Sequence, residues 1–260
     1  MAGPRNRPDS VRSGFRSLTA FADSAKSVKT DRAIVVPAYQ AQSTIGDVVG
    51  RLRRLHPDTV VLVVDDGSED ATSRTALAAG GRVHRLERNA GKGTALAAGL
   101  RLLADDGFRW VLAMDSDGQH LPEEAGRFLS ATFSDSVGLV VGARRLHPDC
   151  MPFPRVCSNR LTTFLLELQA RKRLWDSQCG YRMYNLDAVR LAQIPSNGRF
   201  EWESEAMVRI ARAGFDVAKV DISTVYGDAG SHIRPWRDTT RFVKLWFRLW
   251  GVRPKDARKA

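Results

Sequence analysis

The sequence predicts an α/β fold in which a mostly parallel sheet is flanked by helices. Short β-branched or apolar runs alternate with stretches of helical spacing through the first half of the chain. Such alternation is typical of a parallel sheet that is covered on both faces. A chain of 260 residues, 43% of them hydrophobic, can bury a sizeable core and fits one large α/β domain or two small ones.

The expected strands are the runs bounded by turn residues, and the expected helices lie between them. In order, strands are expected at 32–39, 59–68, 82–88, 109–115 and 137–144, and helices at 43–55, 69–80, 92–105 and 122–132. Beyond residue 155 the pattern is more helical, with helices expected at 158–171 and 201–213 and one more strand at 217–225. Polar residues collect where the expected strands end. In open α/β sheets, ligands bind beyond those carboxyl ends.

The net charge of +11 comes from the two ends of the chain. Residues 1–30 carry six Lys or Arg against two Asp or Glu, and residues 231–260 carry nine against two, whereas the other 200 residues hold 25 of each sign. We therefore expect a flexible basic leader at 1–30, a globular domain at 31–230, and a basic amphipathic helix and tail at 231–260. A basic excess confined to the ends favours an anionic phospholipid surface over a nucleic-acid partner.

The C-terminal stretch has the composition of a helix at a membrane surface. Its basic residues Arg237, Arg241, Lys244 and Arg248 share one face at helical spacing, and Phe, Trp and Leu cover most of the rest. Three of the six Trp residues lie here, and Trp favours the membrane interface. A helix that packs on the core with its arginines in water is the alternative. The chain has neither an apolar run long enough to span a bilayer nor a secretory signal, and its three cysteines form no CxxC pair. We expect a cytoplasmic protein that is peripheral on the cytoplasmic face of the membrane.

The segment "MDSDGQH" (114–120) is a candidate metal site. Asp115 and Asp117 follow the apolar run "RWVLA", and Gln119 comes two positions later. Two carboxylates and an amide at the carboxyl end of a buried strand suit Mg²⁺ or Mn²⁺, which take few protein ligands and complete their shell with substrate phosphates. The pattern also occurs by chance in acidic turns, so it gains weight only from its neighbours.

Two other segments, "VVDDGS" and "NAGKGT", each allow a structural interpretation as well as a functional one. In "VVDDGS", Asp65 and Asp66 end a strand and either cap the next helix or accept hydrogen bonds from a base or ribose. In "NAGKGT", the glycines and Lys92 fail the pattern of a phosphate-binding loop. They leave a glycine-rich turn that opens a helix, with a lysine that is either solvated or close to a phosphate.

Six segments in register resemble the family-2 glycosyltransferases of GT-A fold, and among them the dolichyl- and polyprenyl-phosphate sugar synthases. The segments are "VVPAY", "VDDGSEDAT", "NAGKGTALAAG", "MDSDGQH", "VGARR" and "DSQCGYRMY", and the resemblance covers residues 32 to 226. It implies an inverting transferase that uses a nucleotide-diphosphate sugar, Mg²⁺ or Mn²⁺ as cofactor, and a lipid-linked acceptor, with polyprenyl phosphate as the preferred expectation.

The resemblance also implies roles for individual residues. Those expected to bind the nucleotide sugar are Pro37, Tyr39, Asp65, Asp66, Lys92, Asp115 and Ser116. Those expected to hold the metal are Asp115, Asp117, Gln119 and His232. Those expected to meet the acceptor are Arg144, Arg155, Ser158, Gln178 and Arg182, with Asn159 beside them. A catalytic role is expected for Asp117, Asp176, Glu203 and Arg144.

Glu203 separates two classes of acceptor. Relatives that glycosylate a hydroxyl place an acidic residue near this position as a base, because a hydroxyl must lose its proton during attack. A phosphate acceptor is already an anion and needs little such help. A saccharide or other hydroxyl acceptor therefore remains an alternative to polyprenyl phosphate.

Two other functions compete with transfer. A sugar-nucleotidyltransferase would carry a basic, glycine-rich loop after the first strand, whereas residues 37–50 contain no Lys or Arg. A catalytically silent, membrane-docked binding module is the alternative of another class. The intact pair of aspartates with Gln119 argues against such a module.

Overall fold

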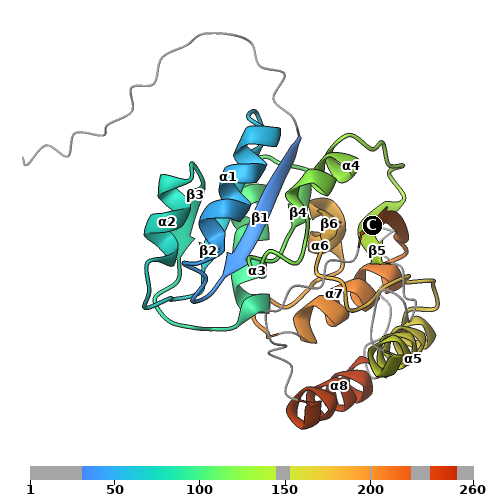
Figure 1. Ribbon diagram of the computed structural model, residues 1–260. Coiled ribbons are helices and arrows are strands. Elements are labelled where there is room, and N and C mark those ends of the chain that lie inside the picture. The colour runs from blue at the N-terminus through green and yellow to red at the C-terminus, as the bar shows by residue number, and fades with distance from the viewer. Residues whose placement is uncertain (1–30, 145–152, 200, 224–234, 251–260) are drawn as a thin grey trace, which may run out of the picture.

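The computed structural model describes residues 31–144, 153–199, 201–223 and 235–250 (Figure 1). The expected leader at 1–30, His232 and the last ten residues lie outside the described residues. A seven-stranded sheet runs through the molecule in the order β3-β2-β1-β4-β6-β5-β7. The strands are β1 (Arg32–Ala38), β2 (Val60–Asp65), β3 (Arg82–Arg85), β4 (Trp110–Ala113), β5 (Val137–Arg144), β6 (Arg182–Asn185) and β7 (Asp216–Ile222).

The first four strands form a parallel half-sheet with helices on its two faces. β1 pairs in parallel with β2 on one side and with β4 on the other, and β3 continues beyond β2. The chain moves outward from β1 to β3 through α1 (Ile45–Leu55) and α2 (Thr72–Ala78), then returns to β4 through α3 (Lys92–Asp105). Because such crossovers are right-handed, α1 and α2 cover one face and α3 covers the other. The expected mostly parallel sheet flanked by helices is confirmed.

The second half contains a strand and a helix that the sequence pattern did not predict. β6 lies between β4 and β5 and is antiparallel to both, and α6 (Leu186–Leu191) follows it directly. Asn185 caps α6, since its side chain accepts hydrogen bonds from the backbone N–H groups of Asp187 and Ala188. The strand is only four residues long and begins within the segment "DSQCGYRMY", for which the sequence pattern predicted no helix or strand.

Three helices form a layer outside the second half of the sheet. α5 (Phe153–Ala170), α7 (Glu201–Arg212) and α8 (Pro235–Trp250) contact one another, and α7 also contacts β5 and β7. Figure 1 shows α5 and α8 side by side at the edge of the molecule. The Trp246 indole N–H donates to the Leu165 carbonyl at 3.2 Å. On the side of α8 that faces the protein, Leu245 and Leu249 are 2% and 0% exposed. The C-terminal helix therefore packs on the domain, as the alternative reading expected.

The opposite side of α8 is apolar and open to solvent, so packing on the domain uses only part of the helix. Val243, Phe247 and Trp250 are exposed there. Within the part of the chain that the structure describes, no helix has both the length and the hydropathy needed to cross a membrane.

Several expected boundaries were wrong by a few residues. α2 begins at Thr72 because the Asp70 carboxylate accepts the Thr72 backbone N–H at 2.9 Å and so precedes the helix. The helix expected at 122–132 is a short 3-10 turn, η1 (Pro122–Glu124), followed by α4 (Ala125–Leu129). α5 begins at Phe153, five residues before the expected start.

Candidate active site

The candidate site lies at the carboxyl ends of β1, β2 and β4. Ala38, at the end of β1, pairs with Asp65 at the end of β2. Asp115 lies two residues beyond Ala113, the last residue of β4. From β1 the chain moves to β2 on one side of it, and after β3 it crosses to β4 on the other side of β1. The carboxyl ends of β1 and β4 are therefore a topological switch point, the place at which open α/β sheets bind ligands. Pro37 is buried in β1, and Tyr39, directly beyond the strand, is 48% exposed.

Asp65 and Asp66 are buried and hold the loops at this edge of the sheet. Asp65 accepts the Ser68 N–H at 2.8 Å and the hydroxyl of Ser73. Asp66 accepts the N–H groups of Ala90 and Gly91, each at 2.8 Å. Asp66 thereby ties the end of β2 to the turn that opens α3.

Lys92 joins two carboxylates that lie far apart in the sequence. Its ammonium is 2.6 Å from an Asp115 oxygen and 2.8 Å from Glu203 Oε2. The side chains of Lys92, Asp115 and Glu203 are 18%, 25% and 10% exposed. The other oxygen of Glu203, Oε1, is buried and has no hydrogen-bond partner. The start of α3, the end of β4 and the start of α7 thus meet at one cation.

Charge pairing dominates the electrostatics of this cluster. Burial would by itself raise the pKa of Asp115, but the Lys92 ammonium outweighs burial and holds that pKa at about 2. Burial would lower the pKa of Lys92, yet the Asp115 and Glu203 carboxylates raise it well above its ordinary value. Asp115 and Lys92 therefore both stay charged at neutral pH.

Two glycines permit the close approach that brings these groups together. A Cβ on Gly93 would lie 2.4 Å from Trp202 Cβ and 2.5 Å from the Arg199 carbonyl oxygen, so the start of α3 packs directly on the start of α7. A Cβ on Gly180 would lie 2.6 Å from Asp115 Oδ2. Any larger residue at either position would push the loop away from the cluster.

Asp117, Ser116 and Gln119 form a turn beyond Asp115. Asp117 and Gln119 are exposed, and Asp117 Oδ1 accepts the Gln119 backbone N–H at 2.9 Å. No group of three or more His, Cys, Asp or Glu suited to a metal ion occurs among the described residues. The donors present, two carboxylates and one amide, fit an ion such as Mg²⁺ or Mn²⁺ that keeps few protein ligands and shares substrate phosphates.

A second network lies on the side of β5 and α5. The Arg144 guanidinium donates to both oxygens of Asp176, with Nε at 2.8 Å and Nη2 at 3.1 Å. Asn159 of α5 donates to Asp176 Oδ1 at 3.1 Å, and Thr163 donates to Asn159 Oδ1 at 3.2 Å. Burial would raise the pKa of Asp176, but its hydrogen bonds with Arg144 keep that pKa below the ordinary value. Asp176 thus fixes Arg144, which is 20% exposed, beside the site.

Arg182 does not have the placement expected of an acceptor-binding residue. It is 1% exposed, and its guanidinium donates at 2.7 Å to each of the carbonyls of Ser177, Cys179 and Glu203. These hydrogen bonds hold the 176–182 segment against α7 inside the protein. The expectation that Arg182 contacts the acceptor is therefore wrong, and its role in this structure is to link that segment to α7.

The remaining residues expected to meet the acceptor lie at the surface. Arg155 and Ser158 are exposed on α5, and Gln178 is exposed in the loop after it. Gln178 Nε2 donates to the Thr162 hydroxyl at 3.3 Å. The structure thus brings Arg144, Asp176 and Asn159 into one network, whereas Arg155 and Ser158 are exposed to solvent on the helix that carries Asn159.

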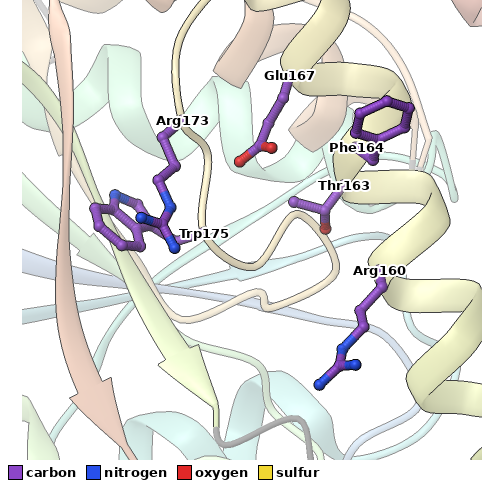
Figure 2. Close-up of a pocket in the computed structure, with 6 residues that line it drawn as sticks. All are labelled: Arg160, Thr163, Phe164, Glu167, Arg173 and Trp175. Carbon is purple, nitrogen blue, oxygen red and sulfur yellow. The ribbon is translucent and has the colours of Figure 1, made fainter.

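Two cavities of the described structure lie away from the Lys92 cluster. One, of about 220 Å³, lies between α5 and the loop after it (Figure 2). The other, of about 210 Å³, lies between α7, the loop before it and Arg248 of α8. The groups that carry charge at the strand ends thus lie outside both cavities.

The sequence pattern did not predict two features of the site. His120 is buried, stacks on Tyr181 with ring centroids 5.0 Å apart, and accepts the Asp115 backbone N–H at 3.3 Å. The pairing of Lys92 with Glu203 was also unforeseen. Both residues had drawn attention separately, but no local signal links two positions that meet only through packing of α3 on α7.

Known proteins resemble the chain in both sequence and structure. Residues 33–191 match the Glycosyl transferase family 2 domain. The undecaprenyl-phosphate mannosyltransferase of Micrococcus luteus is 32% identical over 207 residues, which cover 75% of this chain and 84% of that protein. The polyprenol monophosphomannose synthase of Mycolicibacterium smegmatis is 31% identical over 234 residues, which cover 84% of this chain and 86% of that protein.

A solved structure supports the same fold. The glucosyl-3-phosphoglycerate synthase of Mycobacterium tuberculosis, crystallised with Mn²⁺, uridine diphosphate and phosphoglyceric acid, superposes with a TM-score of 0.61 at 22% identity. The superposition covers 85% of this chain and 78% of that one. The expected GT-A fold is confirmed.

Proposed function

Because the chain belongs to glycosyltransferase family 2, we propose that it transfers a hexose from a nucleotide-diphosphate sugar to a lipid-linked phosphate such as polyprenyl phosphate. One of its relatives is named an undecaprenyl-phosphate mannosyltransferase and another a polyprenol monophosphomannose synthase. The nucleotide sugar occupies the carboxyl ends of β1, β2 and β4, near Tyr39, Asp66 and Ser116.

The observation that carries the proposal is the pairing of Glu203 with Lys92. A general base must be available to take a proton from the acceptor. Here one Glu203 oxygen contacts the Lys92 ammonium at 2.8 Å and the other is enclosed by protein. This arrangement supports an acceptor that arrives as an anion over one that must be deprotonated, and so favours a phosphate over a saccharide hydroxyl.

Asp115, Asp117 and Gln119 would hold Mg²⁺ or Mn²⁺, and the ion, when bound, would supply positive charge for the leaving diphosphate. Lys92, at the start of α3, adds positive charge on the same side of the donor. Arg144, oriented by Asp176, binds the acceptor phosphate. The acceptor oxygen attacks the sugar C1 from the face opposite the diphosphate, so the new C–O bond forms as the C1–diphosphate bond breaks and the configuration inverts.

The acceptor side of this proposal includes the membrane. A polyprenyl chain lies in the bilayer, so the enzyme must reach it there. The exposed apolar side of α8 and the basic residues of that helix support peripheral contact with the cytoplasmic face of the membrane, because aromatic and basic side chains together suit the headgroup region.

The decisive experiment compares two acceptors that differ only in the phosphate. Purified protein is incubated with labelled UDP- and GDP-hexoses, with Mg²⁺, Mn²⁺ or chelator, and with a short-chain polyprenyl phosphate or the matching polyprenol. We expect metal-dependent transfer to the phosphate alone, with inverted configuration in the product. Transfer to the polyprenol, or to neither acceptor while the donor still binds, would overturn the proposal, and the second result would support the silent binding module.

A further inference from the structure

Most of the exposed large apolar side chains of the described residues gather on two neighbouring helices. The α5/α8 face is defined by Phe153, Leu161, Phe164 and Leu168 of α5 and by Val243, Phe247 and Trp250 of α8, each 46% to 68% exposed. Only a few such side chains are exposed on the rest of the described surface. A large exposed apolar patch of this kind marks a surface for interaction.

The two sets of side chains form one continuous surface. Leu161, Phe164 and Leu168 recur at intervals of three and four residues, as do Val243, Phe247 and Trp250, so each set lies on one side of its helix. Trp246 joins the helices: its indole N–H bonds to α5, and its ring lies 5.4 Å from Phe247 and 4.8 Å from Trp250. The α5/α8 face therefore presents aromatic and aliphatic groups over both helices.

Basic side chains lie beside this surface. Residues 153–175 contain four Arg and one Lys but only one acid, Glu167, and the Oε1 atom of Glu167 accepts the Leu174 backbone N–H at 2.9 Å. Arg160 is exposed on α5, one residue before Leu161, and Lys244 is exposed on α8, one residue after Val243. An apolar surface with a basic margin complements a layer of anionic headgroups above an acyl interior.

The cavity beside α5 opens at the margin of the α5/α8 face. Figure 2 shows it between Arg160 and Phe164 of α5 and the Arg173–Trp175 pair of the following loop. The Arg173 guanidinium carbon lies 4.2 Å from the centre of the Trp175 ring, and the Lys219 ammonium lies 5.2 Å from the same ring. The cavity, of about 220 Å³, is also lined by Thr163 and by one carboxylate, Glu167, whose Oε1 accepts the Leu174 N–H. The two guanidinium groups outnumber that carboxylate, so the lining has a net positive charge that suits a phosphate group.

We propose that the α5/α8 face rests on an anionic phospholipid bilayer and that the Arg160–Arg173 cavity receives an anionic lipid headgroup. A second copy of the chain fits less well. In a symmetric dimer the same surface would meet itself and would bring the two basic margins together, and like charges opposed across an interface are costly. A bilayer instead offers an acyl interior to the apolar side chains of the α5/α8 face and anionic headgroups to the basic side chains beside it.

This inference deepens the proposed function, on which its biological purpose rests. Asn159 and Thr163, on the inner side of α5, belong to the Asp176–Arg144 network, whereas Leu161, Phe164 and Leu168 lie on the outer side. One helix thus separates the catalytic network from the proposed membrane surface.

The test is sedimentation of the full chain with vesicles of phosphatidylcholine alone or mixed in equal parts with phosphatidylglycerol. We expect the wild-type protein to bind the anionic vesicles and to be released as salt rises, because lysine and arginine attraction is screened. Leu161→Ser/Leu168→Ser should weaken binding by at least about tenfold. Arg160→Gln/Arg173→Gln should weaken binding to anionic vesicles by about tenfold or more, because each basic residue contributes to attraction at the surface.

Matched controls come from the far end of the sheet. Leu77 of α2 is 58% exposed and Arg74 is exposed on the same helix, so Leu77→Ser and Arg74→Gln should bind as the wild type does. Equal losses in these controls, or anionic vesicle binding that the α5 variants leave unchanged, would overturn the proposal. A lipid-free dimer that Leu161→Ser/Leu168→Ser dissociates would assign the surface to a second copy instead.

A water-soluble short-chain polyprenyl phosphate separates this inference from the proposed function. Leu161→Ser/Leu168→Ser should transfer sugar to that acceptor as fast as the wild type does, and should lose transfer only when the acceptor is embedded in vesicles. If the wild-type protein binds vesicles as expected but never glycosylates the soluble phosphate, the function fails while the docking surface stands.

Discussion

The strand-end side of the site and the α5/α8 side are built in opposite ways. At the strand ends the carboxylates of Asp65 and Asp66 are buried and accept hydrogen bonds from backbone N–H groups and a hydroxyl of the protein. On α5 and α8, large apolar groups remain exposed and arginines stand at the margin. The first side is arranged in advance for one small polar ligand. The second is an open surface whose complement must be large and apolar.

The largest expected effect comes from removing an exposed carboxylate on the first side. Asp117→Ala should lower the rate of transfer by about 10³-fold, because the carboxylate would hold the ion that neutralises the leaving diphosphate. The thermal midpoint should not change, since Asp117 is exposed. Initial rates with the short-chain polyprenyl phosphate measure the loss, and Asp58→Ala, an exposed carboxylate remote from the carboxyl ends of the strands, is the control. A variant that keeps its full rate would contradict the assignment of Asp117.

Removing the Lys92 ammonium should lower the free energy of unfolding. Lys92→Met leaves Asp115 and Glu203 without their common partner, and breaking a largely buried pair should cost about 3 kcal/mol in the free energy of unfolding. The control is Lys219→Met, whose exposed pair with Asp221 should contribute less than about 1 kcal/mol. Urea denaturation of both variants checks the difference. Two equal losses would show that the Lys92 cluster is no stronger than a surface pair.

The pH dependence of the same variant sharpens this test. Asp115 has a pKa of about 2 in the folded protein against about 3.9 in an unfolded chain. Its contribution to stability is thus present above about pH 4 and is lost as the pH falls toward 2. The difference in unfolding free energy between the wild type and Lys92→Met should be flat near neutral pH and should narrow over that acidic window. A difference that grows on acidification would contradict the pairing.

Alanine substitutions on the two sides of α8 should affect stability and vesicle binding differently. Leu249 is 0% exposed, so Leu249→Ala should cost about 2–4 kcal/mol in unfolding free energy through a cavity. Phe247 is 65% exposed, and Phe247→Ala should change stability by no more than about 0.5 kcal/mol while it weakens vesicle binding. Urea denaturation and vesicle sedimentation measure the two quantities. If both variants lost stability alike, the outer side of α8 would be a structural surface.

The smallest expected effect concerns Glu203. Glu203→Gln should keep transfer to a polyprenyl phosphate within about tenfold of the wild-type kcat, because the acceptor needs no base. A hydroxyl acceptor would instead lose about 10² to 10⁴ in rate. Glu201→Gln, at the start of the same helix, serves as the control, and the folding of both variants is checked by circular dichroism. A loss in the larger range would replace the phosphate acceptor by a hydroxyl.

The sequence pattern was most informative where chemistry and local structure coincide. Buried runs that end in Asp65 and Asp115 predicted β2, β4 and the polar edge, because strand periodicity and turn residues are local signals. β6 was missed because four residues between partners from other parts of the chain carry little periodicity. The role of Arg182 was misjudged for a related reason. Whether a guanidinium meets a ligand or the carbonyls of its own protein depends on how the 176–182 segment packs on α7.

The position of β6 also sets a constraint on how the protein is made. A ribosome releases β1 to β4 first, and the edge of β4 that faces β6 stays unpaired until Arg182–Asn185 has emerged. An unpaired edge of a hydrophobic strand invites pairing with other chains. Until the missing strand arrives, the nascent chain therefore depends on slow translation, a chaperone or low concentration to avoid aggregation. A stop codon placed between β5 and β6 should accordingly yield inclusion bodies, although every residue that precedes the stop is native.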